Sequence, residues 1–272
     1  MRAQNKISLF SQSLFALNMD DAIKTTALVG YPAIELACIA PHFDLATARK
    51  EADRIAVLIK DAGLTVSALS LFNNFTDPKC FEEQILSAET YIRLAPLFGA
   101  TLIKMTPGAP ASAQASAAHW NSLKAAIKHL IPMAENFGVR LAFETHMRQL
   151  TDTLASSKRL LEMADSDRIG LTVDFSNLAF AGEKMPCVLD AFRDRIYNTH
   201  LKNGYIDQAG GWHFQALNEG YIDYPALLRL LRDAEYEGYF TIECLGTDAK
   251  EKPAETATRD LKILQHCLAL PG

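Results

Sequence analysis

Residues 137–146 read FGVRLAFETH, and this stretch decides the fold. A segment of helical period ends at Phe137, Gly138 follows as a helix stop, and an apolar run then leads to Glu144. A glycine between a helical segment and a short apolar run is typical of a helix that is followed by a strand. The same succession recurs at Ala62-Gly63-Leu64 and at Tyr236-Glu237-Gly238. The chain is therefore predicted to alternate helices with strands.

Outward from this unit, eight short apolar runs predict eight strands. They are residues 7–14, 33–39, 64–72, 101–105, 140–146, 169–174, 196–201 and 239–245. Helical spacing predicts helices over residues 22–29, 45–62, 77–97, 112–137, 153–164, 184–193, 224–234 and 253–268, the first capped by Asp20 and Asp21. Strict alternation indicates a parallel sheet, because parallel neighbours need a crossover between them. Eight such units in roughly 250 residues predict a closed (β/α)8 TIM barrel.

A doubly wound open sheet is the alternative architecture for an alternating chain. Such a sheet normally carries a glycine-rich fingerprint after its first strand. Residues 15–20 follow the first predicted strand and contain no glycine. The sequence therefore favours the barrel, as one domain spanning residues 1–272.

Composition excludes several other classes. The 272 residues are 49% hydrophobic and 22% charged, which excludes collagen-like and disordered chains. The formal charge of −5 argues against a nucleic-acid partner, because such proteins concentrate Lys and Arg. Five cysteines without CxxC spacing predict reduced thiols. We see neither a signal peptide nor an apolar run of spanning length, and expect a cytoplasmic protein with no membrane partner.

Each of the last four predicted strands ends in a group that can bind a metal ion. The runs read RLAFETH, IGLTVDFSN, IYNTHLKN and YFTIECL, and the groups are Glu144, Asp174, His200 and Glu243. Active-site groups of a TIM barrel lie at the C-terminal ends of its strands. Burying such groups together is costly unless something compensates their charge. A shared divalent cation would do so.

Strand alternation supports convergence of these four groups. The residues two positions earlier, which share their face, are Ala142, Thr172, Asn198 and Thr241. They are small or hydrogen-bonding and can supply a polar layer below the cluster. For any one group, the alternative is a cap of the next helix or a surface ion pair. Recurrence on four successive strands favours a metal site.

The chain resembles the xylose-isomerase-like family of TIM barrels, which includes ketose 3-epimerases, hydroxypyruvate isomerase and inosose dehydratase. The resemblance covers nearly the full chain and is carried by LAFETH, LTVDFSN, THLKN and residues 218–243, NEGYIDYPALLRLLRDAEYEGYFTIE. It implies one divalent ion, commonly Mn2+, bound by Glu144, Asp174, His200 and Glu243, with Glu144 and Glu243 as the acid–base pair. Oxygen-rich ligands with one imidazole suit Mn2+ or Mg2+, and Co2+ is possible. Dimers or tetramers are common in the family, so a homo-oligomer is expected.

Two departures from the family pattern leave the substrate open. Many family epimerases have D-x-x-H where this chain has Asn177, and H-x-K-D where it has Asn203. We predict substrate contacts for Asn177, His146 and Lys202, the last two because they share the inward face of the neighbouring ligands. Lys104, within the fourth predicted strand, is expected to form a buried structural pair with Glu35, and a contact to the substrate is the less favoured alternative. His213 is the remaining candidate, and it lies with Trp212 in the loop after the seventh predicted strand; this pair and residues 72–75 are expected to wall the pocket.

The leading hypothesis is a metal-dependent isomerase or epimerase of a small sugar or hydroxy-carbonyl substrate. A carboxylate would remove the proton next to the carbonyl, a cation would stabilise the enediolate, and a second carboxylate would return the proton. The alternative is a dehydratase of a keto-polyol such as an inosose, because the same enediolate can expel a hydroxyl. A nuclease of the apurinic-endonuclease branch and a non-catalytic binding protein fit less well. No glycine-rich phosphate cradle stands out, which favours an unphosphorylated substrate.

Overall fold

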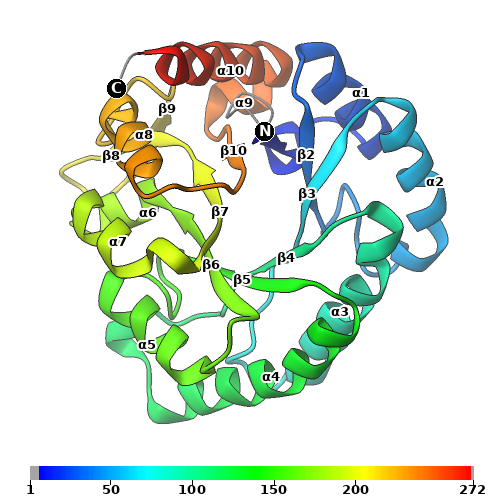
Figure 1. The fold of residues 1–272 in the computed structure, drawn as a ribbon, viewed down its shortest axis with the longest axis vertical. Helices are drawn as coiled ribbons and strands as arrows, with labels where there is room; N and C mark the ends of the chain where they lie inside the picture. Colours follow the sequence, from blue (N-terminus) through cyan, green and yellow to red (C-terminus); the bar gives the residue numbers. More distant parts are fainter. Residues whose placement is uncertain (1–5, 271–272) are drawn as a thin grey trace.

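A computed structural model describes residues 6–270. Within that range, eight parallel strands close into a barrel in the order β1-β10-β7-β6-β5-β4-β3-β2. Figure 1 shows the helices surrounding the strands, with α10 beside α1 where the ring closes. The predicted (β/α)8 barrel is thus confirmed, and the open sheet is excluded.

The barrel strands are β1 (Ile7–Phe10), β2 (Ala33–Ala37), β3 (Thr65–Ser70), β4 (Leu102–Met105), β5 (Arg140–Glu144), β6 (Ile169–Asp174), β7 (Ile196–Leu201) and β10 (Phe240–Ile242). The helices are α1 (Met19–Val29), α2 (Ala48–Asp61), α3 (Phe81–Leu94), α4 (Ala117–Asn136), α5 (Leu154–Ala164), α6 (Phe175–Phe180), α7 (Met185–Phe192), α8 (Tyr224–Asp233), α9 (Thr247–Glu251) and α10 (Pro253–Ala269). No helix among the described residues combines the length and the apolar character needed to cross a membrane.

The first strand and the first helix differ from their predicted bounds. The strand ends at Phe10, and Ser11–Leu14 forms a 3-10 turn whose Ser11 Oγ accepts a hydrogen bond from the Ala37 amide at 2.8 Å. Asn18, not the predicted Asp20 or Asp21, caps α1, because its side chain accepts a hydrogen bond from the Asp21 amide at 2.9 Å. Both side chains, Ser11 and Asn18, thus accept hydrogen bonds from backbone amides where the chain turns between β1 and α1.

Strand alternation separates two environments. Phe143, Val173 and Ile242 are fully buried in the main core, which lies between the strands and the helices. Ala68, Leu102 and Ala142 form a separate small cluster inside the barrel. The interior turns polar toward the C-terminal ends of the strands, where charged side chains replace these small apolar ones. This polarity places the chemistry at one mouth of the barrel.

An antiparallel hairpin beside this mouth was not predicted. It consists of β8 (Asn203–Ile206) and β9 (Trp212–Gln215), and it begins directly after β7. These residues were expected to form a loop. Their short runs around Asp207–Gly211 carry the turn signals of a hairpin.

Gly108 gives a test of how tightly the loops at the mouth are packed. Its φ is +110°, and a Cβ there would overlap Asn74 Oδ1 and lie 2.9 Å from Thr76 Oγ1. Gly138 also has a left-handed φ, +66°, but a Cβ there would meet nothing within 4 Å. Gly138→Ala should cost the left-handed penalty alone, about 1–2 kcal/mol. Gly108→Ala should lose about 1–3 kcal/mol more, from overpacking.

Urea unfolding of the two alanine variants measures this difference directly. Equal losses of unfolding free energy would contradict the close packing of the loops after β3 and β4.

Candidate active site

The four predicted metal-binding groups converge at the barrel mouth. Glu144, Asp174, His200 and Glu243 each offer a ligand atom, and these atoms lie within 4.8 Å of one another. All four side chains are buried. They come from the ends of β5, β6, β7 and β10, and Asp174 pairs in register with His200. The Glu243 amide extends the β10–β7 pairing by donating to the Leu201 carbonyl at 2.9 Å.

Glu35 orients His200. Its Oε1 lies 2.8 Å from His200 Nε2, while His200 Nδ1 faces Glu144 Oε1 at 3.2 Å. Asn198 Nδ2 donates to Glu35 Oε2 at 2.8 Å, and Thr241 Oγ1 donates to Asn198 Oδ1 at 3.1 Å. The polar layer expected from Asn198 and Thr241 is thus present. An imidazole held by a carboxylate through one nitrogen, with the other nitrogen directed at the remaining candidate ligands, is the usual arrangement of a metal-binding histidine.

The contact between Glu35 and His200 was not predicted. The predicted Glu35–Lys104 pair is wrong. Lys104 Nζ instead lies 2.5 Å from Glu144 Oε2. The rings of Phe10 and Phe72 cover the ammonium, with Nζ 5.6 Å and 4.8 Å from their centroids. Two inward carboxylates were available to Lys104, and strand pattern alone does not decide between them.

Asp174 fills both roles that the sequence analysis weighed for a strand-end carboxylate. It is the N-cap of α6, where its Oδ1 accepts a hydrogen bond from the Asn177 amide at 2.9 Å. Its Oδ2 points to the cluster and pairs with Lys202 Nζ at 2.7 Å. The same Nζ lies 2.7 Å from Glu243 Oε2. One oxygen of Asp174 therefore caps α6, and the other faces the cluster.

Asn177 does not reach the cavity at the barrel mouth. Its side chain is buried, and its Nδ2 donates to the Thr145 carbonyl at 3.0 Å. The predicted substrate contact of Asn177 is therefore not supported, because the side chain points to the β5–α5 connection. Its amide and side chain instead hold Asp174 and Thr145 in place.

The charges of the site are unbalanced. Four buried carboxylates (Glu35, Glu144, Asp174 and Glu243) face two ammonium groups (Lys104 and Lys202). Burial alone would lower the pKa of His200, but Glu35 and Glu144 outweigh burial and raise it to about 10. Burial alone would raise the pKa of Glu144, but Lys104 and His200 outweigh burial and hold it well below its usual range. A protonated His200 offsets only part of the excess negative charge, which favours a bound cation.

A cavity of about 320 Å³ opens onto this cluster. Its lining includes the predicted His146 and Lys202, together with Glu144 and Glu243. The other lining residues are amides, aromatic rings and further side chains from the surrounding loops: Gln12, Phe72, Asn73, Thr106, Met147, Gln149, Trp212, Phe214 and Leu245. Phe72 and Asn73 thus wall the pocket as expected, whereas Phe75 is buried in the core. Gln12 and Gln149 escaped prediction because polar loop residues carry no periodic signal.

His213 does not line the cavity, contrary to the prediction. Its Nε2 lies 2.6 Å from Asp207 Oδ2, and its ring stacks on Tyr205 at 4.9 Å between centroids. Its neighbours Trp212 and Phe214 face the cavity instead. The reason is strand alternation along β9, a strand that the sequence analysis did not predict. Across the mouth, the Arg148 guanidinium packs over the Trp212 ring at 4.4 Å.

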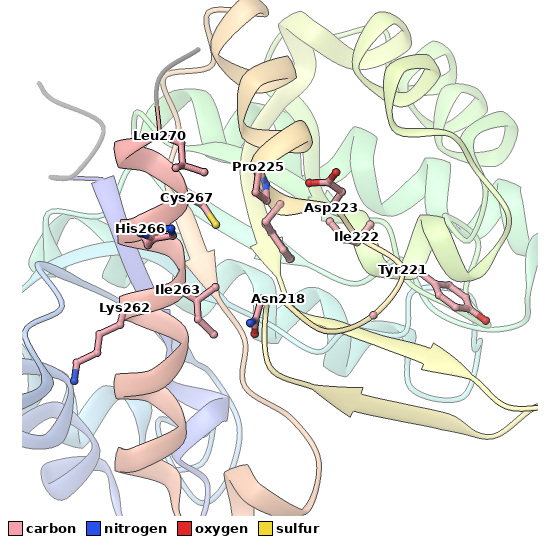
Figure 2. A pocket seen from close by; sticks show the side chains of 12 residues that line it. Asn218, Tyr221, Ile222, Asp223, Pro225, Lys262, Ile263, His266, Cys267 and Leu270 are labelled. Carbon is pink, nitrogen blue, oxygen red and sulfur yellow. The ribbon is translucent and has the colours of Figure 1, made fainter.

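A larger hollow, about 690 Å³, lies away from the cluster. Figure 2 shows it between α10, which contributes Ile263 and Cys267, and the start of α8 with the residues before it, which contribute Pro225 and Ile222. Its lining includes none of the four convergent groups. Size alone therefore does not mark the candidate active site, whereas the convergence of charged groups does.

Comparisons with known proteins agree with this geometry. An inosose dehydratase from Lacticaseibacillus casei is 25% identical over 166 residues, 56% of each chain, so the match spans little more than half of that relative. Two solved structures share the fold at a TM-score of 0.80. The probable 3-DHS dehydratase AsbF from Bacillus anthracis is 22% identical, covering 96% of this chain and 98% of that one. The IOLI protein, with a bound zinc atom, is 19% identical, covering 97% of both chains.

A family model described as a xylose isomerase-like TIM barrel matches residues 23–267. That match includes all four convergent groups and nearly the whole barrel. The chain belongs to the xylose isomerase-like TIM barrel family.

Proposed function

We propose that this protein is a divalent-metal-dependent dehydratase that removes water from a small, uncharged keto-polyol. The observation that carries the proposal is the buried cluster of Glu144, Asp174, His200 and Glu243 at the floor of a cavity. Two of the similar proteins are named dehydratases, one of them for inosose. These names support dehydration over the isomerase or epimerase activity that the sequence motifs suggested first.

The donor set fits a divalent cation. Three carboxylates and one imidazole nitrogen, His200 Nδ1, face a common centre, and such oxygen-rich sets suit Mn2+ or Mg2+. A similar protein of the same fold holds zinc, which supports a metal without fixing its identity. With His200 neutral, the excess of two negative charges matches one such ion. When bound, the ion would act as a Lewis acid toward the carbonyl and hydroxyl oxygens of the substrate.

The two glutamates that line the cavity differ in their freedom to move a proton. Lys104 and His200 occupy both oxygens of Glu144, which keeps that carboxylate ionised. Among the described residues, the Glu243 side chain has one polar contact, from Oε2 to Lys202, and its other oxygen faces no charged partner. We therefore assign Glu243 to remove the proton next to the carbonyl and Glu144 chiefly to hold the metal.

The cavity walls favour a neutral substrate. The amides of Gln12, Asn73 and Gln149 can donate to and accept from hydroxyl groups. The rings of Trp212 and Phe214 offer flat apolar faces to a carbon ring. Among the lining residues, Lys202 carries the one ammonium, and two carboxylates already neutralise it. The lining set holds no other lysine and no arginine, and the Arg148 guanidinium packs against the Trp212 ring outside that set.

An assay with an inosose and with simple ketoses in deuterated buffer tests the proposal. The Mn2+-loaded protein should convert the inosose to a product lighter by one water, followed by mass spectrometry. Deuterium incorporation or a new stereoisomer without loss of water would instead establish an isomerase or epimerase. Neither reaction, combined with tight binding of the inosose, would identify a binding protein.

Glu243→Gln should lower kcat about 10²–10⁴-fold, the usual contribution of a positioned acid or base. Its metal content, measured by atomic absorption, must be matched to that of the unaltered protein, because Glu243 is also a candidate ligand. Glu219→Gln, an exposed glutamate in the loop before α8, serves as the control and should leave kcat unchanged. Full activity in Glu243→Gln would exclude the assigned role.

Glu35→Gln should weaken Mn2+ binding about 10–100-fold, because residues that orient a ligand contribute that much to metal affinity. Isothermal titration calorimetry measures the dissociation constant. Glu89→Gln is the matched control, since Glu89 pairs with His129 at 2.8 Å on the surface. An unchanged dissociation constant in Glu35→Gln would show that His200 does not depend on Glu35 for its orientation.

A further inference from the structure

The backbone of Lys202 is fixed between β7 and the hairpin. Its carbonyl oxygen accepts hydrogen bonds from the Ser176 hydroxyl and from the Tyr224 hydroxyl, the latter at 2.7 Å. Both hydroxyl groups belong to buried residues, at the starts of α6 and α8. Any movement of the Lys202 ammonium must therefore come from rotation of its side chain and not from a shift of the strand.

The Lys202 ammonium occupies oxygens that a metal ion would need. Its Nζ lies 2.7 Å from Asp174 Oδ2 and 2.7 Å from Glu243 Oε2. Asp174 has no second oxygen to offer, because its Oδ1 accepts the Asn177 amide as the cap of α6. A cation bound to Asp174 Oδ2 would lie next to the ammonium, and the two positive charges would repel each other at short range.

Lys104, the other buried lysine of the cluster, is placed differently. It pairs with Glu144 Oε2 beneath the rings of Phe10 and Phe72, and it is not among the residues that line the cavity. The other oxygen of Glu144, Oε1, is occupied only by His200 Nδ1, which is itself a candidate ligand and would give up its proton, and with it this contact, on binding the same ion. Lys104 can therefore remain where it is while Glu144 binds a metal ion.

Lys202, in contrast, has a place to move to. Its side chain lines the cavity, and its Nζ lies 5.6 Å from the centroid of the Phe214 ring. An ammonium near an aromatic face is stabilised by the quadrupole of the ring. Rotation away from Asp174 would keep the charge close to Glu243 and Phe214 and bring it into the space where the substrate binds.

We propose that Lys202 is a displaceable internal cation, which pairs with Asp174 and Glu243 until a metal ion binds and is then driven into the cavity. The inference rests on the metal site of the proposed function but not on the reaction assigned to it. Lys202 competes with the metal for two carboxylates, so it lowers metal affinity. The displaced ammonium then faces the substrate only in the loaded protein.

Mn2+ titration by calorimetry of the unaltered protein, Lys202→Met and Lys104→Met tests the proposal. Lys202→Met should lower the dissociation constant at least about tenfold, a change of the size found for residues around metal ligands. Lys104→Met removes the same charge from the same cluster and should lower it by a clearly smaller factor. Circular dichroism in the presence of a chelator checks that each variant folds.

The outcomes separate the competing explanations. Weaker or unchanged binding in Lys202→Met would overturn the proposal and show that the lysine supports the site. Equal tightening in both variants would also overturn it, because a general effect of charge would then suffice. If neither the unaltered protein nor Lys202→Met binds Mn2+, the metal site itself fails, and the inference fails with it.

A crystal structure of the unaltered protein with Mg2+ tests the same point without any substitution. Lys202 Nζ should then lie beyond hydrogen-bond distance, about 3.5 Å, from Asp174 Oδ2. An ammonium still in contact with both carboxylates beside the bound ion would overturn the proposal.

Discussion

Negative charge confined at one end of the barrel is the constraint that organises this molecule. Glu35, Glu144, Asp174 and Glu243 are buried where water cannot solvate them, so each must face a cation or a donor. Lys104, Lys202 and the imidazole of His200 meet that need in part. Much of the surrounding structure serves to hold these groups in place: Asn198 orients Glu35, and the start of α6 holds Asp174.

The fold and the four convergent groups could be predicted from the sequence because both depend on local patterns. Alternation within each strand places Glu144 and Ala142 on the same face whatever the neighbouring strands do. Closure of the ring then brings the C-terminal strand ends together. The predicted bounds of β6 and β7 agree with the structure, because a β-branched or apolar residue opens each strand and its metal-binding group stands at or next to its end.

Contacts that depend on side-chain reach could not be predicted in this way. Lys104 lies inside the barrel as alternation requires. Its long side chain pairs with Glu144 and not with Glu35, and its ammonium lies beneath the rings of Phe10 and Phe72. The predicted place of His213 in the cavity wall was wrong, because the orientation of its side chain depends on β9, whose register is set by pairing with β8. Asp174 was expected to be either a helix cap or a metal ligand. Its Oδ1 caps α6, and its Oδ2 faces the cluster.

The two asparagines at positions that depart from the family pattern bond backbone carbonyls. Asn177 is directed toward the Thr145 carbonyl, and Asn203 Nδ2 donates to the carbonyls of Leu217 and Ile222 at 2.8 Å and 2.9 Å. Both asparagines thus hold backbone and present nothing to a substrate. The polar groups beside the two glutamates are then His146 and Lys202, with amides and rings from the loops above them. Loss of water needs a proton donor at the departing hydroxyl, whereas epimerisation needs one at carbon. Lys202 lines the cavity next to Glu243, but Asp174 and Glu243 outweigh burial and raise its pKa, so the ammonium holds its proton and does not by itself separate the two reactions.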